Sequence, residues 1–229
     1  MKLFTTCAAA AALALLASAG AASAQDAKVS VNAAVTSDYV FRGFSQTNED
    51  PAVQAGVDLT VGSFYAGAWA SNVDFGDNTE AEIDLYGGFR GEAKGYAWDV
   101  GVVTYLYAPG ANGDYDYVEL KAAVSRAVGP VTAGAAVYFS PDFFGVDEDA
   151  TYLEGNLAYS PIENLTLSGA LGKQWLSVSD NYTTWNIGGT YAFAGTPLAL
   201  DVRYHDTDVD DPSIPISDGR INATLKVVF

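Results

Sequence analysis

The sequence predicts an all-β fold, a closed antiparallel transmembrane β-barrel, and three observations lead to it. Apolar and polar residues alternate with a period of two through most of the chain. The connections between the alternating segments are short and long in turn. An apolar leader that ends in a cleavage motif precedes the first segment. Together these features indicate an exported chain that crosses a membrane with strands.

The alternation starts at Val29, where Val29, Val31, Ala33 and Val35 are separated by mostly polar residues, and it ends at Phe229. Successive strand side chains point to opposite faces, so each segment has one apolar and one mostly polar face. We count twelve such segments, the first over residues 29–41. No stretch after the leader approaches the roughly 18 apolar residues of a membrane helix. Any membrane crossing therefore uses strands.

The connections between the segments have two kinds of length. The short ones lie at residues 62–63, 91–95, 128–130, 160–164 and 194–197. The longer ones, rich in Asp, Asn and Gly, lie at residues 43–50, 76–80, 108–116, 140–150, 173–181 and 206–219. Short periplasmic turns and longer, acidic extracellular loops are typical of outer-membrane barrels. An even number of strands places both chain ends on the short-turn side.

The first 24 residues have the features of a bacterial signal peptide. A positively charged start leads into an apolar run, which ends at the small-x-small motif Ala22-Ser23-Ala24. The alternatives are a buried N-terminal helix or an uncleaved membrane anchor. The abrupt change to polar residues after the motif favours cleavage, so we expect residues 1–24 to be removed and residues 25–229 to form the barrel.

The composition excludes several classes of function. The chain has 11 Lys and Arg against 28 Asp and Glu, and loss of the leader with its one Lys leaves 11 − 1 = 10 basic residues and a formal charge of 10 − 28 = −18. Phosphate contacts need clustered basic residues, so we expect no nucleic-acid partner. The only Cys also leaves with the leader. The remaining chain therefore has no thiolate zinc site and no cysteine nucleophile.

Alternation alone does not say which face is inside, because a soluble barrel or sandwich would turn its aliphatic face inward. Twelve strands enclose more space than aliphatic side chains fill, since roughly eight suffice for a packed interior. The polar face also carries many small residues and few Lys, unlike a soluble surface. Phe229 ends an alternating strand, which resembles the assembly signal of outer-membrane proteins. These features favour an aliphatic face that meets lipid.

Large aromatic residues on the apolar face lie near the strand ends, as interfacial girdles require. Those expected near the short turns are Tyr65, Phe89, Tyr96, Trp98, Tyr159, Tyr191, Phe193 and Phe229. Those expected near the long loops are Tyr39, Phe41, Phe75, Phe139, Trp185 and Tyr204. On the segment after the first short turn, Trp69 lies four residues after Tyr65 and therefore on the same face of the strand, so we expect it to point outward as well.

Three stretches carry a resemblance to a known family. They are SDYVFRGFSQTNEDPAVQAGVD at residues 37–58, FYAGAWASNVDF at residues 64–75 and EIDLYGGF at residues 82–89. The chain resembles the TorF-type family of conserved proteobacterial outer-membrane proteins, which are regarded as porins. The resemblance is specific over roughly the first third of the chain after the leader, and beyond that it rests on pattern and length. It implies an outer-membrane barrel of porin type, with no established substrate and no catalytic residues.

The polar face carries the charges that would line a pore. They are Asp38, Arg42, Asp58, Asp74, Glu82, Asp84, Arg90, Asp99, Glu119, Lys121, Glu154, Asp201, Arg203, His205 and Lys226. Because the last strand must pair with the first, we expect one basic wall and a facing acidic wall, with a transverse field between them. The basic wall would hold Arg42, Arg203, His205 and Lys226, and the acidic wall Asp58, Asp74, Glu82, Asp84 and Asp99. The alternative is that these charges pair across a narrow lumen and close it.

Two further motifs are incomplete. The run at residues 206–211 begins like a calcium loop, but Asp211 stands where Gly is expected and Ser217 where the closing Glu is expected. The acidic run at residues 147–149 is also incomplete, so solvated loops are the favoured reading and we expect no metal and no cofactor. His205 is the only histidine and has no recognisable Ser partner, so we expect no enzyme.

The favoured function is an outer-membrane channel for passive diffusion of small hydrophilic solutes, with a preference for cations because of the acidic excess. Its expected partners are these solutes, outer-membrane lipid and lipopolysaccharide. One alternative is a closed structural or adhesive outer-membrane barrel without transport. Another is a soluble periplasmic barrel that binds an apolar ligand. The sequence gives neither the solute nor the oligomeric state.

Overall fold

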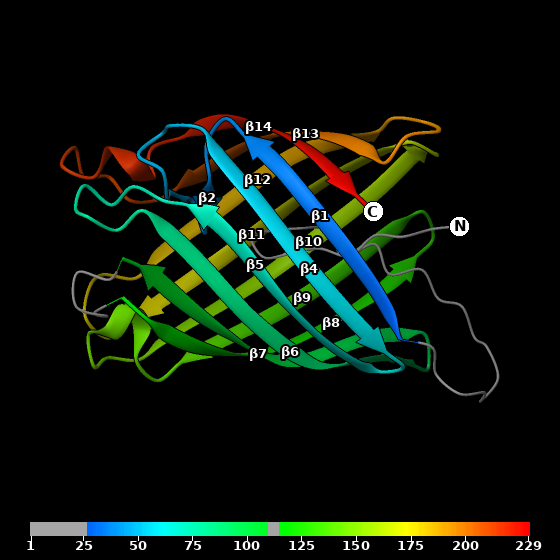
Figure 1. The fold of residues 1–229 in the computed structure, drawn as a ribbon, viewed down its shortest axis with the longest axis horizontal. Helices are drawn as coiled ribbons and strands as arrows, with labels where there is room; N and C mark the ends of the chain where they lie inside the picture. The colour runs from blue at the N-terminus through cyan, green and yellow to red at the C-terminus, as the bar shows by residue number, and fades with distance from the viewer. Residues whose placement is uncertain (1–26, 110–114) are drawn as a thin grey trace.

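The computed structural model describes residues 27–109 and 115–229, and the signal peptide expected at residues 1–24 lies outside the described residues. The chain forms a closed antiparallel barrel whose strands are strongly tilted (Figure 1). The twelve barrel strands are β1 (Lys28–Thr36), β4 (Ala52–Val61), β5 (Phe64–Asn72), β6 (Ala81–Ala93), β7 (Tyr96–Ala108), β8 (Tyr117–Val128), β9 (Val131–Ser140), β10 (Ala150–Ile162), β11 (Leu165–Leu176), β12 (Tyr182–Ala192), β13 (Leu198–Thr207) and β14 (Arg220–Val228). The prediction of a closed twelve-stranded antiparallel barrel is confirmed.

The first strand closes the barrel by pairing with both β4 and the last strand, β14. Val35 lies opposite Val53 on one side and opposite Leu225 on the other. The backbone of Phe229 exchanges two hydrogen bonds with Val31, with N···O distances of 2.8 and 3.1 Å. Closure leaves no unpaired strand edge, which a membrane interior would not tolerate.

The two ends of the barrel differ in the length of their connections. Short turns gather at one end, and Lys94 and Gly95 show their geometry, because both have a positive φ, as tight hairpin turns require. Long loops gather at the other end, which lies at the left of Figure 1. They contain two short 3₁₀ helices, η1 (Phe143–Gly145) and η2 (Pro215–Ser217). Within the described ranges, no helix is long and apolar enough to cross a membrane.

The two faces of the barrel wall have opposite character. Aliphatic side chains project from the outer surface, as Leu157 on β10 and Ile187 on β12 show at 58% and 67% exposure. The inward positions carry polar groups, and Asp99, Glu154 and Arg203 are all buried there. A soluble barrel has the reverse arrangement, with aliphatic residues inside. The structure therefore contradicts the soluble alternative and has the surface of a membrane barrel.

Strand β5 corrects part of the aromatic prediction. Tyr65 and Trp69 point into the barrel rather than outward, and Trp69 is only 6% exposed. The outer positions of β5 hold Phe64 and three alanines, followed by the exposed Asn72 at the end of the strand. Because both faces of β5 are apolar, its alternation has too little contrast to reveal the direction of the side chains.

Of the other aromatic residues, some face outward near the barrel ends and some face the interior. The exposed ones near the short turns are Phe89, Tyr96, Tyr159, Tyr191, Phe193 and Phe229. Those near the long loops are Phe139, Trp175 and Tyr204. Tyr39 and Phe41, expected in the outer girdle, are buried inside, and Phe75, from a loop, packs against Tyr107 of the same buried cluster with ring centroids 5.5 Å apart. The interior thus holds more aromatic surface than expected.

The connection between β1 and β4 accounts for these inward aromatics. The first strand was expected to continue to Phe41, but it ends at Thr36, whose hydroxyl donates to the Asp38 carbonyl at 2.8 Å. The chain then folds inward as a small hairpin, β2 (Val40–Phe41) paired with β3 (Phe44–Ser45). We call residues 37–47 the inner hairpin.

The outward face is testable by placing a charge on it. Leu157→Arg near the middle of β10 should lower the free energy of unfolding in lipid bilayers by about 2–4 kcal/mol, because arginine is costly against the hydrocarbon midplane. Leu157→Phe serves as the control, because it changes volume without adding charge. Urea titration of the protein in liposomes measures both variants. Equal stability of the two variants would contradict a lipid-facing Leu157.

Candidate functional site

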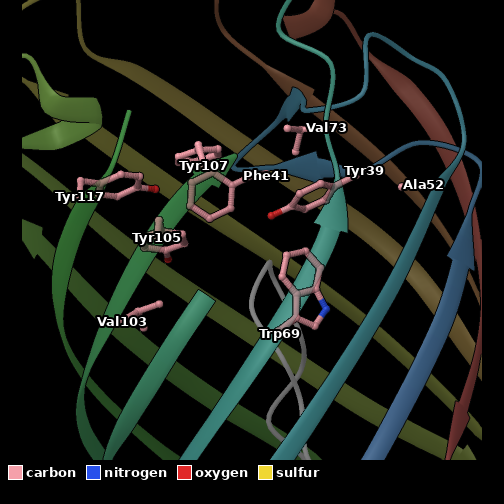
Figure 2. Close-up of a cluster of buried hydrophobic side chains, with 9 residues drawn as sticks. All are labelled: Tyr39, Phe41, Ala52, Trp69, Val73, Val103, Tyr105, Tyr107 and Tyr117. Carbon is pink, nitrogen blue, oxygen red and sulfur yellow. The ribbon is translucent and has the colours of Figure 1, made fainter. Parts of the chain in front are cut away.

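The inner hairpin contacts one side of the interior through aromatic residues. The Tyr39 hydroxyl donates to Glu82 Oε1 of β6 at 2.8 Å, and its ring packs edge-on against Trp69 of β5 with centroids 5.3 Å apart. Phe41 packs in the same way against Tyr105 of β7 at 5.9 Å. Figure 2 shows these side chains converging in the barrel interior. This side of the hairpin therefore has a packed hydrophobic core.

Arg42, at the tip of the inner hairpin, reaches the barrel wall from within. Its Nη1 and Nη2 donate to the two carboxylate oxygens of Glu119 on β8 at 2.8 and 2.7 Å. Nη1 also donates to Gln174 Oε1 of β11 at 3.1 Å. The guanidinium carbon lies 4.4 Å from the ring centroid of Tyr152 and 5.1 Å from that of Tyr138. The Phe41 ring lies 4.7 Å from the same carbon, so Arg42 is held by a bidentate ion pair and by three aromatic faces.

This ion pair is buried, because Arg42 is 8% exposed and Glu119 is 1% exposed. Burial is the largest single influence and lowers the pKa of Arg42, but the charge of Glu119, its hydrogen bonds and the neighbouring Tyr105 and Tyr117 together hold that pKa above its usual value. Taking one partner from a buried pair leaves an uncompensated charge and costs roughly 3–5 kcal/mol. Each partner therefore depends on the other to remain inside the barrel.

The tip of the inner hairpin also rests against strands β12 and β13. Arg42 and Gly43 have φ values of 47° and 91°, the positive signs that a two-residue turn of this kind needs. A Cβ atom on Gly43 would overlap the methyl group of Thr207 and lie 2.7 Å from the hydroxyl oxygen of Thr184. The Phe44 ring packs against Tyr182 with centroids 4.9 Å apart. Only glycine allows so close an approach to the wall.

The base of the inner hairpin is fixed to β14. Asp38 accepts a hydrogen bond from Ser45 Oγ at 2.6 Å and faces Arg220 of β14 at 3.4 Å. Arg220 lies at the same distance from Glu49. The inner hairpin therefore crosses the long-loop end of the interior, from strands β5–β8 to strands β11–β14, and narrows the lumen there.

Most of the predicted charged residues lie on inward positions of the barrel strands. These are Asp58, Glu82, Asp84, Arg90, Asp99, Glu119, Lys121, Glu154, Asp201, Arg203, His205 and Lys226. His205 on β13 pairs with Arg220 on β14, a residue not predicted from the sequence, while Arg203 pairs with Asn222 and Lys226 with Ala199. The acidic residues Asp58, Glu82, Asp84 and Asp99 come from β4, β6 and β7. The basic residues of β13 and β14 thus come from other strands than this acidic group, although Asp201 also stands on β13 beside Arg203.

Three predicted residues lie outside the barrel strands, and one of them is Asp38 at the base of the inner hairpin. Arg42 does not join Arg203 and Lys226 on the basic wall, because the inner hairpin carries it to Glu119 on β8. Asp74 follows the end of β5 and is an exposed loop residue, so it is not part of the acidic wall. The wrong placements of Arg42 and Asp74 have one physical cause. Side chains alternate between the two faces only within a paired strand, and both residues lie beyond the last hydrogen-bonded pair of the strand before them.

The remaining ion pairs of the described interior run along the wall. Lys121 on β8 pairs with Asp99 on the adjacent β7 at 3.0 Å. Arg203 pairs with Asp201 of its own strand at 3.1 Å and donates to Asn186 on β12 at 2.7 Å. These ion pairs join residues of the same or adjacent strands, so they do not cross the lumen. The inner hairpin is the element that crosses the lumen.

The acidic loops offer no built metal site in the ranges that the structure covers, where no group of three or more His, Cys, Asp or Glu side chains is placed to hold a metal ion. Asp206 instead accepts a hydrogen bond from the Tyr204 hydroxyl at 2.7 Å. Asp211 accepts from the Ser213 hydroxyl at 2.7 Å. These carboxylates therefore organise their own loops.

Comparison with solved structures identifies the class of fold. The KdgM porin superposes with a TM-score of 0.61, covering 87% of this chain and 98% of that chain at 9% identity. The NanC porin gives 0.57 over 88% and 99% of the two chains at 11% identity. An outer-membrane channel from Pseudomonas putida F1 gives 0.52 over 91% and 96% at 13% identity. The fold is that of outer-membrane porins.

The chain itself belongs to the family described as bacterial protein of unknown function (Gcw_chp), whose model matches residues 18–226. No curated protein matches the sequence. The KdgM porin has also been solved in complex with disordered oligogalacturonate. At these low identities the porin structures define the fold alone.

The Arg42–Glu119 pair predicts a protease phenotype. Glu119→Gln removes the counter-charge and should release the inner hairpin, since a broken buried pair costs roughly 3–5 kcal/mol. Trypsin should then cut after Arg42 at least about tenfold faster, because 1.4 kcal/mol already corresponds to a factor of ten. Mass spectrometry of the fragment that begins at Gly43 measures the rate in liposomes. Glu92→Gln, at an exposed acid beside a short turn, is the control, and a rate equal to the control would contradict the role of the pair.

Proposed function

We propose that the chain is an outer-membrane channel for passive diffusion of small hydrophilic solutes. The observation that carries the proposal is the closed barrel with an aliphatic outer face and a charged inner face. An exposed aliphatic face is stable against lipid, and a polar interior holds the water through which solutes move. The proposal includes removal of residues 1–24 on export, periplasmic short turns, contact with lipopolysaccharide and membership of the TorF-type porins. It assigns no enzymatic role.

The charges of the interior support a preference for cations. Acidic side chains outnumber basic ones among the inward residues, and several acidic groups have neutral partners. Asp58 accepts from the Tyr86 hydroxyl at 2.7 Å, and Glu154 accepts from the Tyr152 hydroxyl at 3.1 Å. Hydrogen bonds of this kind bring no compensating positive charge to the carboxylate. A negative lumen concentrates cations and repels anions, and the separation of basic and acidic strands favours a transverse field.

A closed structural barrel is the second candidate, and the inner hairpin is the observation that favours it. The hairpin contacts both sides of the interior through Glu82, Glu119, Gln174 and Tyr182. If these contacts never open, the barrel conducts nothing. The hairpin belongs to a loop rather than to the wall, so its removal leaves the barrel strands intact and separates the two candidates.

Planar-bilayer recording of the refolded residues 25–229 tests the proposed function. Discrete conductance steps are expected, and their reversal potential in a potassium chloride gradient should show a cation preference. A variant in which residues 39–47 are replaced by a short Gly-Ser linker should conduct more, because the lumen loses its constriction. Retained heat-modifiable gel mobility confirms that each barrel is folded. Absence of conductance in both proteins would establish the closed barrel instead, and anion preference would overturn the selectivity.

A further inference from the structure

The guanidinium of Arg42 occupies a cage that four consecutive strands of the wall build. Glu119 on β8, Tyr138 on β9, Tyr152 on β10 and Gln174 on β11 all contact it. We infer that this cage is a binding site for solutes with a guanidinium group, and that Arg42 is its internal occupant. The inference rests on the proposed function, since it names a class of solute for the same lumen.

The chemistry of the cage matches a planar cation. A carboxylate that accepts two parallel hydrogen bonds fits the edge of a guanidinium, as Glu119 does at 2.7 and 2.8 Å. The rings of Tyr138 and Tyr152 offer their faces to its charge. A solute without charge would gain neither interaction. The cage therefore selects by charge and by shape.

The inner hairpin adds one face to the cage, because the Phe41 ring lies 4.7 Å from the guanidinium carbon, but the wall residues also hold one another. Glu119 also accepts a hydrogen bond from the Tyr105 hydroxyl of β7 at 3.1 Å, and the Tyr152 hydroxyl donates to Glu154 of its own strand at 3.1 Å. Gln174 is fully buried on β11. Because these partners all belong to barrel strands, the cage keeps its form when Arg42 leaves.

One donor of the occupied cage is unused. Gln174 accepts from Arg42 through Oε1, while its Nε2 has no hydrogen-bond partner in the part of the chain that the structure describes. A buried donor without a partner costs about 1–3 kcal/mol. A solute that carries an acceptor oxygen close to its guanidinium would satisfy this donor, which Arg42 does not.

Arg42 and the cage belong to separate parts of the fold, so a solute can compete with Arg42. The inner hairpin is joined to β1 and β4, and its own pairing is limited to two residues on each side. A tethered group acts at a high effective concentration, in the millimolar range for short flexible linkers. A solute must therefore be abundant to displace it, and displacement would move the inner hairpin away from Glu119. Solute binding and opening of the lumen are coupled in this way.

Isothermal titration of the folded Arg42→Ala barrel in detergent tests the cage, with ethylguanidinium as the probe and N-ethylurea as its uncharged analogue. Saturable binding of ethylguanidinium is expected, at least about tenfold tighter than to the wild-type protein, whose cage is filled. Arg42→Ala combined with Glu119→Gln should lose this binding, and N-ethylurea should bind neither protein. Equal binding of the two probes, or binding that survives Glu119→Gln, would overturn the inference.

If Arg42→Ala does not fold, Arg42→Gln keeps a side chain of similar length without its charge and is titrated in the same way. Heat-modifiable gel mobility reports folding of each variant before titration. The binding measurement needs no conducting pore, so failure of the cage and failure of the proposed channel are separate results. A barrel that binds ethylguanidinium but conducts nothing would retain the cage and lose the channel.

Discussion

The structure depends on one buried ion pair, in which Arg42 of the inner hairpin meets Glu119 of the barrel wall. A guanidinium inside a barrel is stable only where a carboxylate and hydrogen-bond acceptors face it. Glu119 and Gln174 supply those acceptors, and this fixes the depth to which the hairpin enters. The packing of Tyr39 against Trp69 follows from the same placement. The narrow part of the lumen is thus set by a loop and not by the strands.

Most of the fold could be predicted from the sequence, because a period of two is a direct consequence of strand geometry. The aliphatic positions of β1, β10 and β12 contrast sharply with their polar neighbours. The sequence therefore predicts both where each strand lies and which of its side chains face outward. Strand β5 shows where this reasoning fails, since Trp69 and Tyr65 alternate with alanines. Neither face is polar there, and the inward direction goes with long-range contacts, since Trp69 packs against Tyr39 and Tyr65 donates to Asp99 of β7.

The inner hairpin could not be predicted, because its contacts join residues far apart in the sequence. Arg42 lies 77 positions from Glu119 and 132 from Gln174. A local signal does exist, since Arg42-Gly43 stands between Phe41 and Phe44 as a two-residue turn between apolar residues. A second signal is the row of tyrosines at Tyr105, Tyr107 and Tyr117, which share a face with Glu119 and indicate a packed interior rather than open water.

Single-channel recording of the Arg42→Ala barrel beside the wild-type barrel, in the same lipid and salt, tests the role of the ion pair most directly. If Arg42 holds the inner hairpin across the lumen, the variant should be open for a larger fraction of the time and show a larger conductance. Identical recordings from the two proteins would contradict this, because they would mean that the path of the ions does not depend on the hairpin.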